Sequence, residues 1–425
     1  MRTRFIAGFA IALGLFSSSA SAEVWQKSQI EDLIQAAEAA PLEGLPVIED
    51  ALAPVLMFEG QADIDPRYST AADVASTSLF LRLAQIYATG ATDPPTVDPN
   101  WRIPRPADPE ADALLAAISA GERPSTLLNA LLPSSSAYQA LRAELARLRT
   151  APQDSDNDAN ISHVLANLER WRWLPRNFPA RRIEVLLAQY ELEYFDGVTT
   201  APTHFDVIVG APRTPSPVFE AAIESVTLNP YWDPPASIVT RELAPRFARD
   251  PGAATREGFE VLDGAGQALD VTSVHWRTRP FPYHLRQLPG PQNALGRLRF
   301  DLPNAYAVYL HDTPSQSLFE RTTRAFSHGC IRVRTPMALA AALLGDPWDA
   351  TALQNVINTG VTQTIPLSAP TPVYVLYLTV VMNDNGTLRY VDDINHRDAA
   401  IARVLTPASE AVAEIADRQP GCMRE

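Results

Sequence analysis

One cluster of reactive side chains stands out in the sequence: a cysteine, a histidine two residues before it and a second histidine nineteen residues upstream. These are Cys330, His328 and His311. The thiolate is the nucleophile of cysteine enzymes, and because a free thiol has a pKa of about 8.5, it needs a base or a positive charge nearby. His311 is the better candidate for the base, because it ends an expected strand over 305–310 and a returning segment would bring Cys330 beside it. His328 shares one face with Cys330 in an extended chain.

The neighbours of the cysteine also have types that suit acyl transfer. Gly329 has no Cβ, so the backbone can adopt strained angles and amides near Cys330 can point at a developing oxyanion. Such donors are often worth about 3 to 4 kcal/mol each. Arg324, Arg332 and Arg334 supply local positive charge, which suits substrate carboxylates and favours an ionised thiolate.

Two other interpretations of the cluster remain open at this point. A buried cysteine is common in protein cores and is usually inert. A zinc site could use His311, His328 and Cys330, although the pairwise spacing of structural zinc sites is absent. The remaining histidines show no mutual spacing that marks them as ligands, and we interpret them as structural or surface residues: His163, His204, His275, His284 and His396.

The first residues predict export. Arg2 and Arg4 precede an apolar run over 5–16, and small residues ending at Ala22 follow, which is the pattern of a cleaved signal peptide. A membrane anchor is the alternative, but the run is shorter than the roughly 20 residues that a spanning helix needs. We therefore expect an exported protein. In an exported chain with two cysteines, a Cys330–Cys422 disulfide is a further alternative.

Composition limits the possible classes of protein. The 425 residues are enough for two or three domains, and the 46% hydrophobic and 20% charged content is that of a folded globular chain. The net charge of −14 argues against a nonspecific nucleic-acid binder, which would need clustered cations to release phosphate counterions. We expect no nucleic-acid partner and no membrane span after signal cleavage.

Apolar periodicity separates a helical first part from a mainly β second part. Residues 70–87 and 137–149 are predicted helices, whereas 93–110 is a Pro- and Asp-rich loop. The polar stretch 151–160 is interpreted as a linker, or as a loop before a helix starting near Ser162. Strands are predicted at 182–187, 205–209, 297–300, 305–310, 373–382 and 387–391, and further helices at 336–344, 350–358 and 397–418.

Residues 238–268 resemble an insertion within the β part. It is predicted to be helical over 241–247 and then to form a hairpin that turns at Asp263 and Gly264. Gly264 and Gly266 are interpreted as turn glycines and not as a dinucleotide fingerprint, because the third glycine and the βαβ unit are missing. Trp171 and Trp173 are interpreted as packing residues rather than sugar platforms.

With these residues in place, a resemblance becomes specific. The run Ser327-His328-Gly329-Cys330-Ile331-Arg332-Val333 with an upstream His311 resembles the active-site signature of L,D-transpeptidases, and in particular the large Gram-negative type with an N-terminal scaffold domain. Further matching stretches lie at 169–175, 207–210, 229–232, 234–235, 237–238, 289–291, 293–296 and 309–314. The resemblance covers about residues 160–395.

The resemblance implies an α+β fold, in which a helical scaffold precedes a β-sandwich catalytic domain with an inserted capping subdomain. The expected organisation is a signal peptide over 1–22, the scaffold over 23–160, a Trp-rich junction over 161–202, the catalytic domain over 203–368 with its cap at about 238–268, and C-terminal strands and a helix over 369–425. Relatives often carry a peptidoglycan-binding domain before the Trp-rich motif, and residues 151–160 leave no room for one.

The resemblance also implies roles for single residues. Cys330 is the nucleophile and His311 the base, and His328 with the Gly329–Cys330 backbone shapes the oxyanion site. Substrate contacts are expected from Arg332, Ser327, Asp312, Tyr309 and Trp232. No metal and no cofactor are implied.

The implied reaction attacks the bond between an L centre and D-Ala in a tetrapeptide stem, releases D-Ala and forms 3-3 peptidoglycan crosslinks through a Cys330 thioester. The expected partners are donor and acceptor stems and other cell-wall synthases, and carbapenems would acylate the cysteine. Two alternatives stay open: an L,D-carboxypeptidase or endopeptidase that uses the same cysteine, and a non-catalytic cell-wall scaffold protein.

Overall fold

The computed structural model describes residues 25–62, 69–152, 154–199, 201–383 and 385–406. The predicted signal peptide and Cys422 lie outside these residues. Within the described parts of the chain, no helix combines the length and the apolar character that a membrane crossing requires. Contacts divide the chain into two compact units, one from segments up to 132 and the other mainly from 133 onward.

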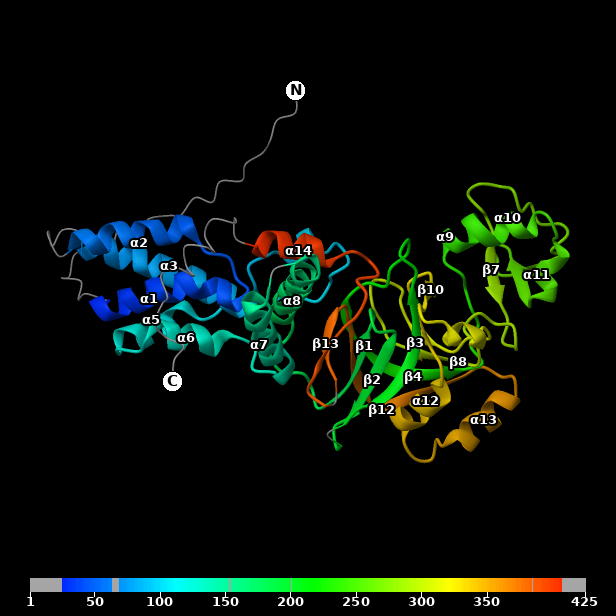
Figure 1. Ribbon diagram of the computed structural model, residues 1–425. Helices are drawn as coiled ribbons and strands as arrows, with labels where there is room; N and C mark the ends of the chain where they lie inside the picture. Colours follow the sequence, from blue (N-terminus) through cyan, green and yellow to red (C-terminus); the bar gives the residue numbers. More distant parts are fainter. Residues whose placement is uncertain (1–24, 63–68, 153, 200, 384, 407–425) are drawn as a thin grey trace, which may run out of the picture. The chain divides into compact units, whose positions relative to one another are not determined.

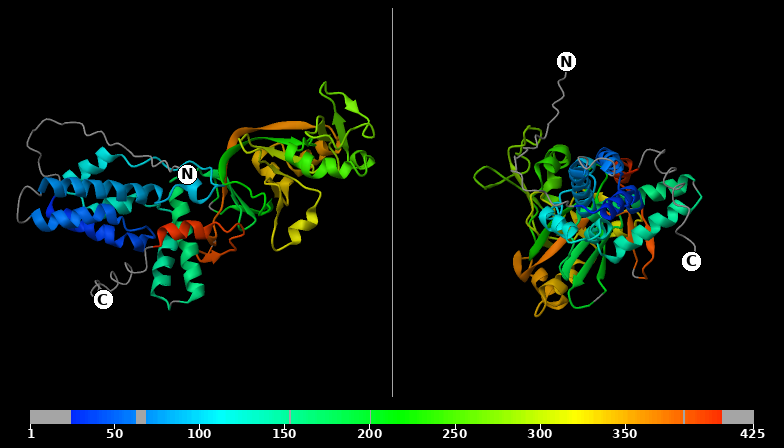
Figure 2. Two further views of the ribbon diagram at one scale, coloured as in Figure 1. Left: turned by 90° about the horizontal axis from the view of Figure 1, so that it is seen from above. Right: turned by 90° about the vertical axis from the view of Figure 1, so that its left-hand side faces the viewer.

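The first unit is a bundle of helices (Figures 1 and 2). Its elements are α1 (Lys27–Ala39), α2 (Glu49–Ala62), α3 (Ser69–Thr89), α5 (Ala111–Ser119) and α6 (Pro124–Leu131). Leu33, Leu79 and Phe80 are fully buried, and Trp25 packs edge-on against Phe80 with ring centroids 5.6 Å apart. Helix α3 contains the helix predicted over 70–87.

The second unit begins with the short α4 (Pro94–Val97) and two long helices, α7 (Ser136–Thr150) and α8 (Ser155–Trp173). Helix α7 matches the prediction, whereas α8 begins seven residues before the expected start near Ser162. The reason is local: the Asp154 side chain accepts hydrogen bonds from the amides of Asp156 and Asn157 and so caps the helix. Most of the predicted linker is therefore helical.

Helix α8 carries the two tryptophans of the predicted junction, Trp171 and Trp173. Trp173 is fully buried and packs edge-on against Trp101, with ring centroids 4.8 Å apart. Trp171 lies on another side of the helix and is half-buried. Two residues on a helix differ by about 200° in direction, so these side chains cannot share a face. The packing role predicted for Trp173 agrees with its burial.

A nine-stranded sheet forms the body of the second unit, in the order β10-β3-β11-β9-β8-β4-β12-β1-β2, and a further β2–β3 pairing closes it. The strands are β1 (Arg181–Leu186), β2 (Glu191–Asp196), β3 (Thr203–Gly210), β4 (Phe219–Leu228), β8 (Leu298–Asp301), β9 (Leu310–His311), β10 (Ala325–Ser327), β11 (Ile331–Val333) and β12 (Gln363–Leu376). The expected fold class, a helical region followed by a β-rich domain, is confirmed, and this barrel-like sheet is compatible with the predicted sandwich.

Two strand predictions need correction. The strand expected over 305–310 is reduced to β9, because Asn304 binds the amides of Tyr306 and Val308 and folds this segment into a turn. The strand expected over 373–382 is two strands, since β12 ends at Leu376 and β13 (Val380–Met382) pairs with β14 (Leu388–Tyr390) in a separate hairpin.

The inserted segment forms a small body with its own core (Figure 1). It contains α9 (Ala236–Ile238), a π-helical turn (Val239–Leu243), α10 (Ala244–Phe247), α11 (Gly252–Arg256), β5 (Phe259–Leu262), β6 (Ala268–Leu269) and β7 (His284–Gln287). Phe259 and Trp276 each pack edge-on against Phe247. We call residues 236–287 the cap. It extends beyond the predicted insertion, because β7 pairs with β5.

The remaining helices cover the second unit. Helices α12 (Pro336–Leu344) and α13 (Ala350–Asn358) have the predicted bounds, and Asp349 caps α13. The last predicted helix is present as α14 (Asp398–Leu405), which packs on α8. Its predicted continuation beyond residue 406 lies outside the described residues.

Candidate functional site

Two short parallel strands bring the candidate reactive residues together. Strands β9 and β11 pair in parallel with Arg332 opposite His311. Because side chains alternate along a strand, Tyr309 lies on the same face as His311, and Cys330 on the same face as Arg332. Four of the predicted site residues thus share one side of the sheet, which is what the sequence analysis expected of a returning segment.

Hydrogen bonds from a neighbouring turn fix the backbone just before the cysteine. The Ser216 hydroxyl donates to the Gly329 carbonyl at 2.7 Å, and the Thr214 hydroxyl donates to the Ser327 carbonyl at 3.0 Å. Gly329 has φ +116°, a conformation that residues with a Cβ rarely adopt. The glycine before Cys330 therefore has the unusual backbone angle expected of it.

Ser327 organises the same loop from within. Its hydroxyl donates to the Cys330 carbonyl at 2.5 Å and accepts the Gly329 N–H at 3.1 Å, and the residue is 3% exposed. The Gly329 amide is thus already used inside the loop and does not point at a substrate in this geometry. Ser327 therefore stabilises the loop conformation, and its hydroxyl is not exposed to a substrate.

The thiol of Cys330 is protonated in the resting site. Burial raises the pKa of Cys330, and contacts with Tyr309 and the charge of Arg332 oppose this only in part. Its Sγ–H donates weakly to the Ala307 carbonyl at 3.7 Å, and Cys330 forms no disulfide with any residue in the described part of the chain. The expected stabilisation of a thiolate by three arginines needs correction, because Arg324 and Arg334 are both paired with Asp206.

His311 is buried and neutral. Burial lowers its pKa to about 3, with the charges of Arg332 and Arg299 acting in the same direction and the Asp312 and Leu295 carbonyls opposing them. Nδ1 lies 2.5 Å from the Asp312 carbonyl oxygen, which can only accept, so Nδ1 carries the proton. The ring is therefore held in the tautomer in which Nε2 carries the lone pair.

Asp312 and His328 occupy supporting positions. The Asp312 carboxylate accepts from the backbone amide and the Nε of Arg297, at 2.9 and 3.0 Å, and its side chain is 3% exposed. It fixes the chain that follows His311 and is not open to substrate. The His328 side chain contacts the cap, where its Nε2 lies 2.6 Å from a carboxylate oxygen of Glu242.

A cavity of about 680 Å³ opens over the thiol. One wall comes from the sheet and its loops and carries Cys330, His311, Arg332 and Tyr309. The other comes from Trp232 and the first turns of the cap. Both predicted contacts Tyr309 and Trp232 line it. Asn229, three residues before Trp232, instead donates to three carbonyls around α13, which is loop packing.

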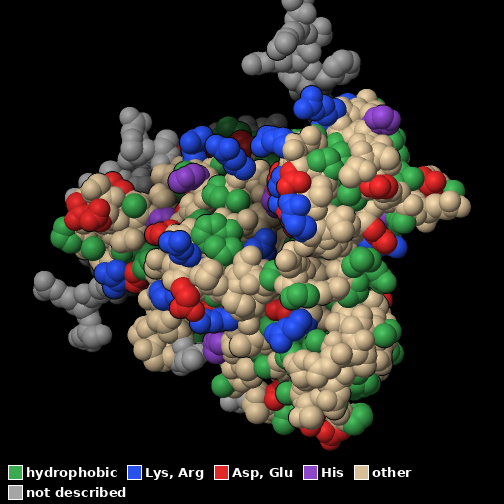
Figure 3. Space-filling view, turned by 90° about the vertical axis from the view of Figure 1, so that its right-hand side faces the viewer, with side chains coloured by type: hydrophobic (Ala, Val, Ile, Leu, Met, Phe, Trp, Pro, Cys, Tyr) green, Lys and Arg blue, Asp and Glu red, His purple; other side chains and the backbone are tan. Residues whose placement is uncertain are grey.

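Positive charge dominates this cavity. Arg213, Arg241 and Arg332 line it, against the single carboxylate of Glu242. Arg332 is partly buried, and its Nε has no hydrogen-bond partner within the described part of the chain. Figure 3 shows several Lys or Arg side chains gathered around a hollow on one face of the molecule. A site of this kind suits a substrate that carries carboxylates.

The zinc alternative at the cysteine finds no support in the geometry. His311 Nδ1 is bound to a carbonyl, and His328 is turned toward Glu242. Among the residues that the structure describes, the only three-residue group with ligand atoms close enough for a metal lies elsewhere, on β2 and β3.

The sequence analysis missed the residues that position the loop. Thr214, Ser216 and Glu242 are far from Cys330 in sequence and match no motif, so no local signal marks them. Gly210, which lies in the matching stretch 207–210, is at the end of β3, where the Thr214–Ser216 turn folds back on it.

Gly210→Ala is expected to lower the free energy of unfolding by about 1 to 3 kcal/mol, the usual cost of overpacking. A Cβ here would lie 2.5 Å from the Ser216 amide nitrogen and closer still to the Thr214 carbonyl oxygen, and backbone cannot move aside cheaply. Thermal unfolding would measure the loss. Gly264→Ala, where an added Cβ meets nothing within 4 Å, is the matched control. Equal melting temperatures for the two variants would contradict the prediction.

Two known protein families match parts of the chain. Residues 180–375 match the YkuD family, described as the L,D-transpeptidase catalytic domain. Residues 15–145 match the Scaffold domain family. The first match contains all of the cavity residues named above, and the second covers most of the first unit.

Individual relatives are consistent with the first match. A Haemophilus influenzae protein named "Putative L,D-transpeptidase" is 33% identical over 252 residues, which are 58% of this chain. The chain spans about half of that relative's length, 50%.

Two solved structures are more remote. The avibactam carbamoyl enzyme of Ldtfm is 15% identical with a TM-score of 0.22, over 53% of this chain and 64% of that one. A cysteine-to-serine mutant of an Enterococcus faecium L,D-transpeptidase is 14% identical with a TM-score of 0.19, over 53% and 65%. Similarity this low supports no conclusion about this chain.

Proposed function

We propose that the chain is a periplasmic L,D-transpeptidase that forms 3-3 crosslinks in peptidoglycan, because residues 180–375 match the L,D-transpeptidase catalytic domain family and residues 15–145 match the Scaffold domain family. The observation that carries the proposal is the placement of a neutral thiol and a neutral imidazole on one face of β9 and β11, beneath an arginine-lined cavity. A cleaved signal peptide and periplasmic location belong to the same proposal, on the pattern of residues 1–22.

Acylation starts from the neutral pair. Nε2 of His311 accepts the thiol proton as the sulfur of Cys330 attacks the carbonyl carbon between the L centre and D-Ala of a tetrapeptide stem. The C–N bond then breaks, the D-Ala amine takes the proton from His311, and a thioester remains. The Nδ1–H bond to the Asp312 carbonyl holds the ring in the required tautomer throughout.

Deacylation uses the same groups in reverse. The side-chain amine of a second stem attacks the thioester carbon, His311 accepts the proton of that amine, and the proton returns to sulfur as the C–S bond breaks. Because Cys330 and His311 are both uncharged at rest, no separated ion pair has to be stored in a buried site before the substrate arrives.

Arg332 is the group best supported for substrate binding. Its guanidinium shares the face of the thiol, and its Nε lacks a partner in the described structure, so a stem carboxylate would satisfy a buried donor. Tyr309 contacts the thiol with its side chain, and burial raises the pKa of Tyr309, which keeps its hydroxyl protonated. A protonated hydroxyl beside the sulfur can donate a hydrogen bond to negative charge that develops on the sulfur.

Purified protein lacking residues 1–22 is expected to convert a disaccharide tetrapeptide into a crosslinked dimer, with release of one D-Ala per crosslink. Mass analysis of the products distinguishes the alternatives. Tripeptide without dimer, in the presence of excess acceptor stem, would make the protein an L,D-carboxypeptidase. No product and no thioester adduct at Cys330 would overturn the proposal and favour a non-catalytic scaffold role.

A further inference from the structure

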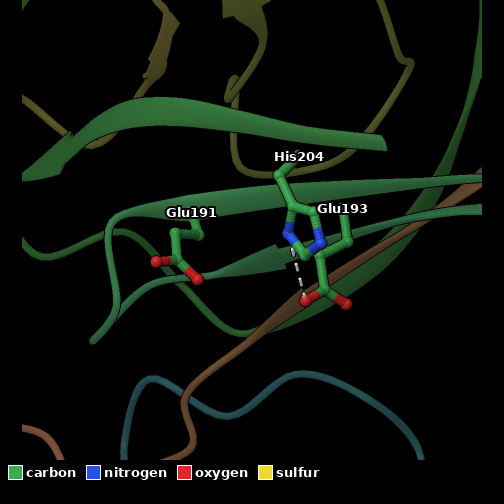
Figure 4. Close-up of side chains that lie close together, drawn as sticks. All are labelled: Glu191, Glu193 and His204. Atoms are coloured by element: carbon green, nitrogen blue, oxygen red, sulfur yellow. Dashed lines mark ion pairs between the residues drawn. The ribbon is translucent and has the colours of Figure 1, made fainter. Parts of the chain in front are cut away.

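A second group of potential ligands lies away from the thiol, on the hairpin of β2 and β3. It consists of Glu191, Glu193 and His204, whose ligand atoms all lie within 4.8 Å of one another (Figure 4). We propose that these three side chains bind a divalent transition metal ion, with Zn²⁺ as the best match. The site is independent of the proposed reaction, and it changes our expectation that no metal is bound and that His204 has only a structural or surface role.

Strand pairing explains why the three side chains converge. In the antiparallel β2–β3 ladder, Glu193 is directly opposite His204. Glu191 is two residues earlier on β2, so it projects from the same face and is the diagonal neighbour of His204. Each ligand therefore comes from a regular strand, and the β2–β3 pairing fixes the spacing without any contribution from a loop.

The distance between the two opposite residues fits shared metal ligation better than a direct hydrogen bond. His204 Nδ1 and a Glu193 carboxylate oxygen are 3.7 Å apart, beyond the range of N–H···O hydrogen bonds. Two ligands at roughly 2.1 Å from one tetrahedral zinc lie roughly 3.4 Å apart. Closing the site needs only a small side-chain movement, and in Figure 4 the carboxylate of Glu191 faces the same space as the imidazole.

Charge also favours a cation here. The guanidinium of Arg389 lies 3.3 Å from Oε2 of Glu191. A divalent ion would be bound by carboxylate oxygens at partly exposed groups, whose side chains are 31%, 20% and 46% exposed for Glu191, Glu193 and His204.

The surroundings leave room for a fourth ligand. All three residues line a cavity of about 900 Å³, which is bordered by α7, α8 and the β13–β14 hairpin. Three protein ligands with one open position are typical of zinc sites that bind water or a ligand group, and a mixed imidazole and carboxylate set suits Zn²⁺ better than Ca²⁺ or Mg²⁺. The metal would also join β2 to β3 at the pairing that closes the sheet.

The test uses the full chain without its first 22 residues, with Cys330→Ala and Cys422→Ser to remove thiol ligands, after treatment with a chelator. Titration with Zn²⁺ in a calorimeter is expected to show one ion bound per chain. His204→Ala, Glu193→Gln and Glu191→Gln should each weaken binding by roughly tenfold or more, as loss of a direct ligand does. Co²⁺ loaded into the same site should give the visible absorption of a four- or five-coordinate centre.

His284→Ala is the matched control, since His284 also pairs with an exposed carboxylate, that of Asp233 at 2.7 Å. This variant should bind Zn²⁺ as tightly as the parent. The proposal is overturned if the parent takes up no Zn²⁺ below about 1 mM. It is equally overturned if His204→Ala binds with unchanged affinity. Both results are independent of crosslinking activity, so they cannot be confused with a failure of the proposed reaction.

Discussion

Cys330→Ala is expected to abolish covalent acylation of the protein, whether the acyl donor is a tetrapeptide stem or a carbapenem. Alanine has no atom that can form a thioester, and no other cysteine among the described residues could replace it. Intact-mass analysis would measure the result directly, because each acyl group adds a fixed mass to the chain. The parent protein should gain that mass and the variant should not.

Two further variants make this prediction specific. Cys422→Ser should acylate normally, because the predicted mechanism uses one thiol only. His311→Ala should acylate about 10²- to 10⁴-fold more slowly, the usual contribution of a general base. A Cys330→Ala protein that still gains the acyl mass would contradict the assignment of the nucleophile. A His311→Ala protein with unchanged kinetics would show that the imidazole does not accept the proton.

The largest loss of stability is expected from Asp398→Ala, which should lower the free energy of unfolding by about 3 to 5 kcal/mol. Arg170 is fully buried, and its guanidinium pairs with Asp398 at 2.6 Å and lies over the ring of Tyr377. The second carboxylate oxygen of Asp398 contacts Nδ1 of His163 and accepts from Thr379. Removing Asp398 leaves the buried guanidinium between α8 and α14 without its ion-pair partner, although the charge of Asp98 still acts on it.

Urea unfolding would measure this loss, with Asp50→Ala as the control. Asp50 pairs with Arg82 at 2.8 Å, but both side chains are largely exposed, so its loss should cost less than about 1 kcal/mol. Equal losses in the two variants would contradict the argument from burial.

The deficit of Asp398→Ala should depend on pH in two ranges. Burial by itself raises the pKa of Asp398, but the charge of Arg170 and the hydrogen bonds from His163 and Thr379 outweigh it, so the pKa is lowered on folding. A carboxyl whose pKa is lowered on folding contributes stability above its unfolded pKa and loses it as the pH falls, so this part of the difference from the parent should shrink below about pH 4. The hydrogen bond to Asp398 also raises the pKa of His163, and this part of the difference should be full below about pH 6.5 and decrease as the pH rises.

Much of the fold was predictable because local patterns and final structure agree. Helices α12 and α13 have the predicted bounds, since an apolar run starts at Pro336 and Asp349 supplies a cap. The failures lie where long-range contacts override a local pattern. Residues 305–309 are apolar enough for a strand, yet Asn304 turns them back, and β7 joins the cap only through its pairing with β5.

The sequence by itself determined the chemistry available to this protein. A cysteine after glycine in Ser327–Val333, with His311 upstream, predicts a thiol nucleophile with an imidazole base, and the resemblance of this run to L,D-transpeptidases implies acyl transfer through a thioester. The type and number of these reactive groups follow from the covalent structure of the chain. They do not depend on how the chain folds, and so they could be read without the structure.

Only the tertiary structure decided the state and setting of those groups. Burial keeps the thiol and the imidazole neutral. Two of the three expected arginines pair with Asp206, and the Gly329 amide donates to Ser327 within its own loop. The strand register likewise brings His204 opposite Glu193. Protonation depends on desolvation and on charges distant in sequence, and cross-strand proximity depends on register, so neither is encoded in the spacing of the residues themselves.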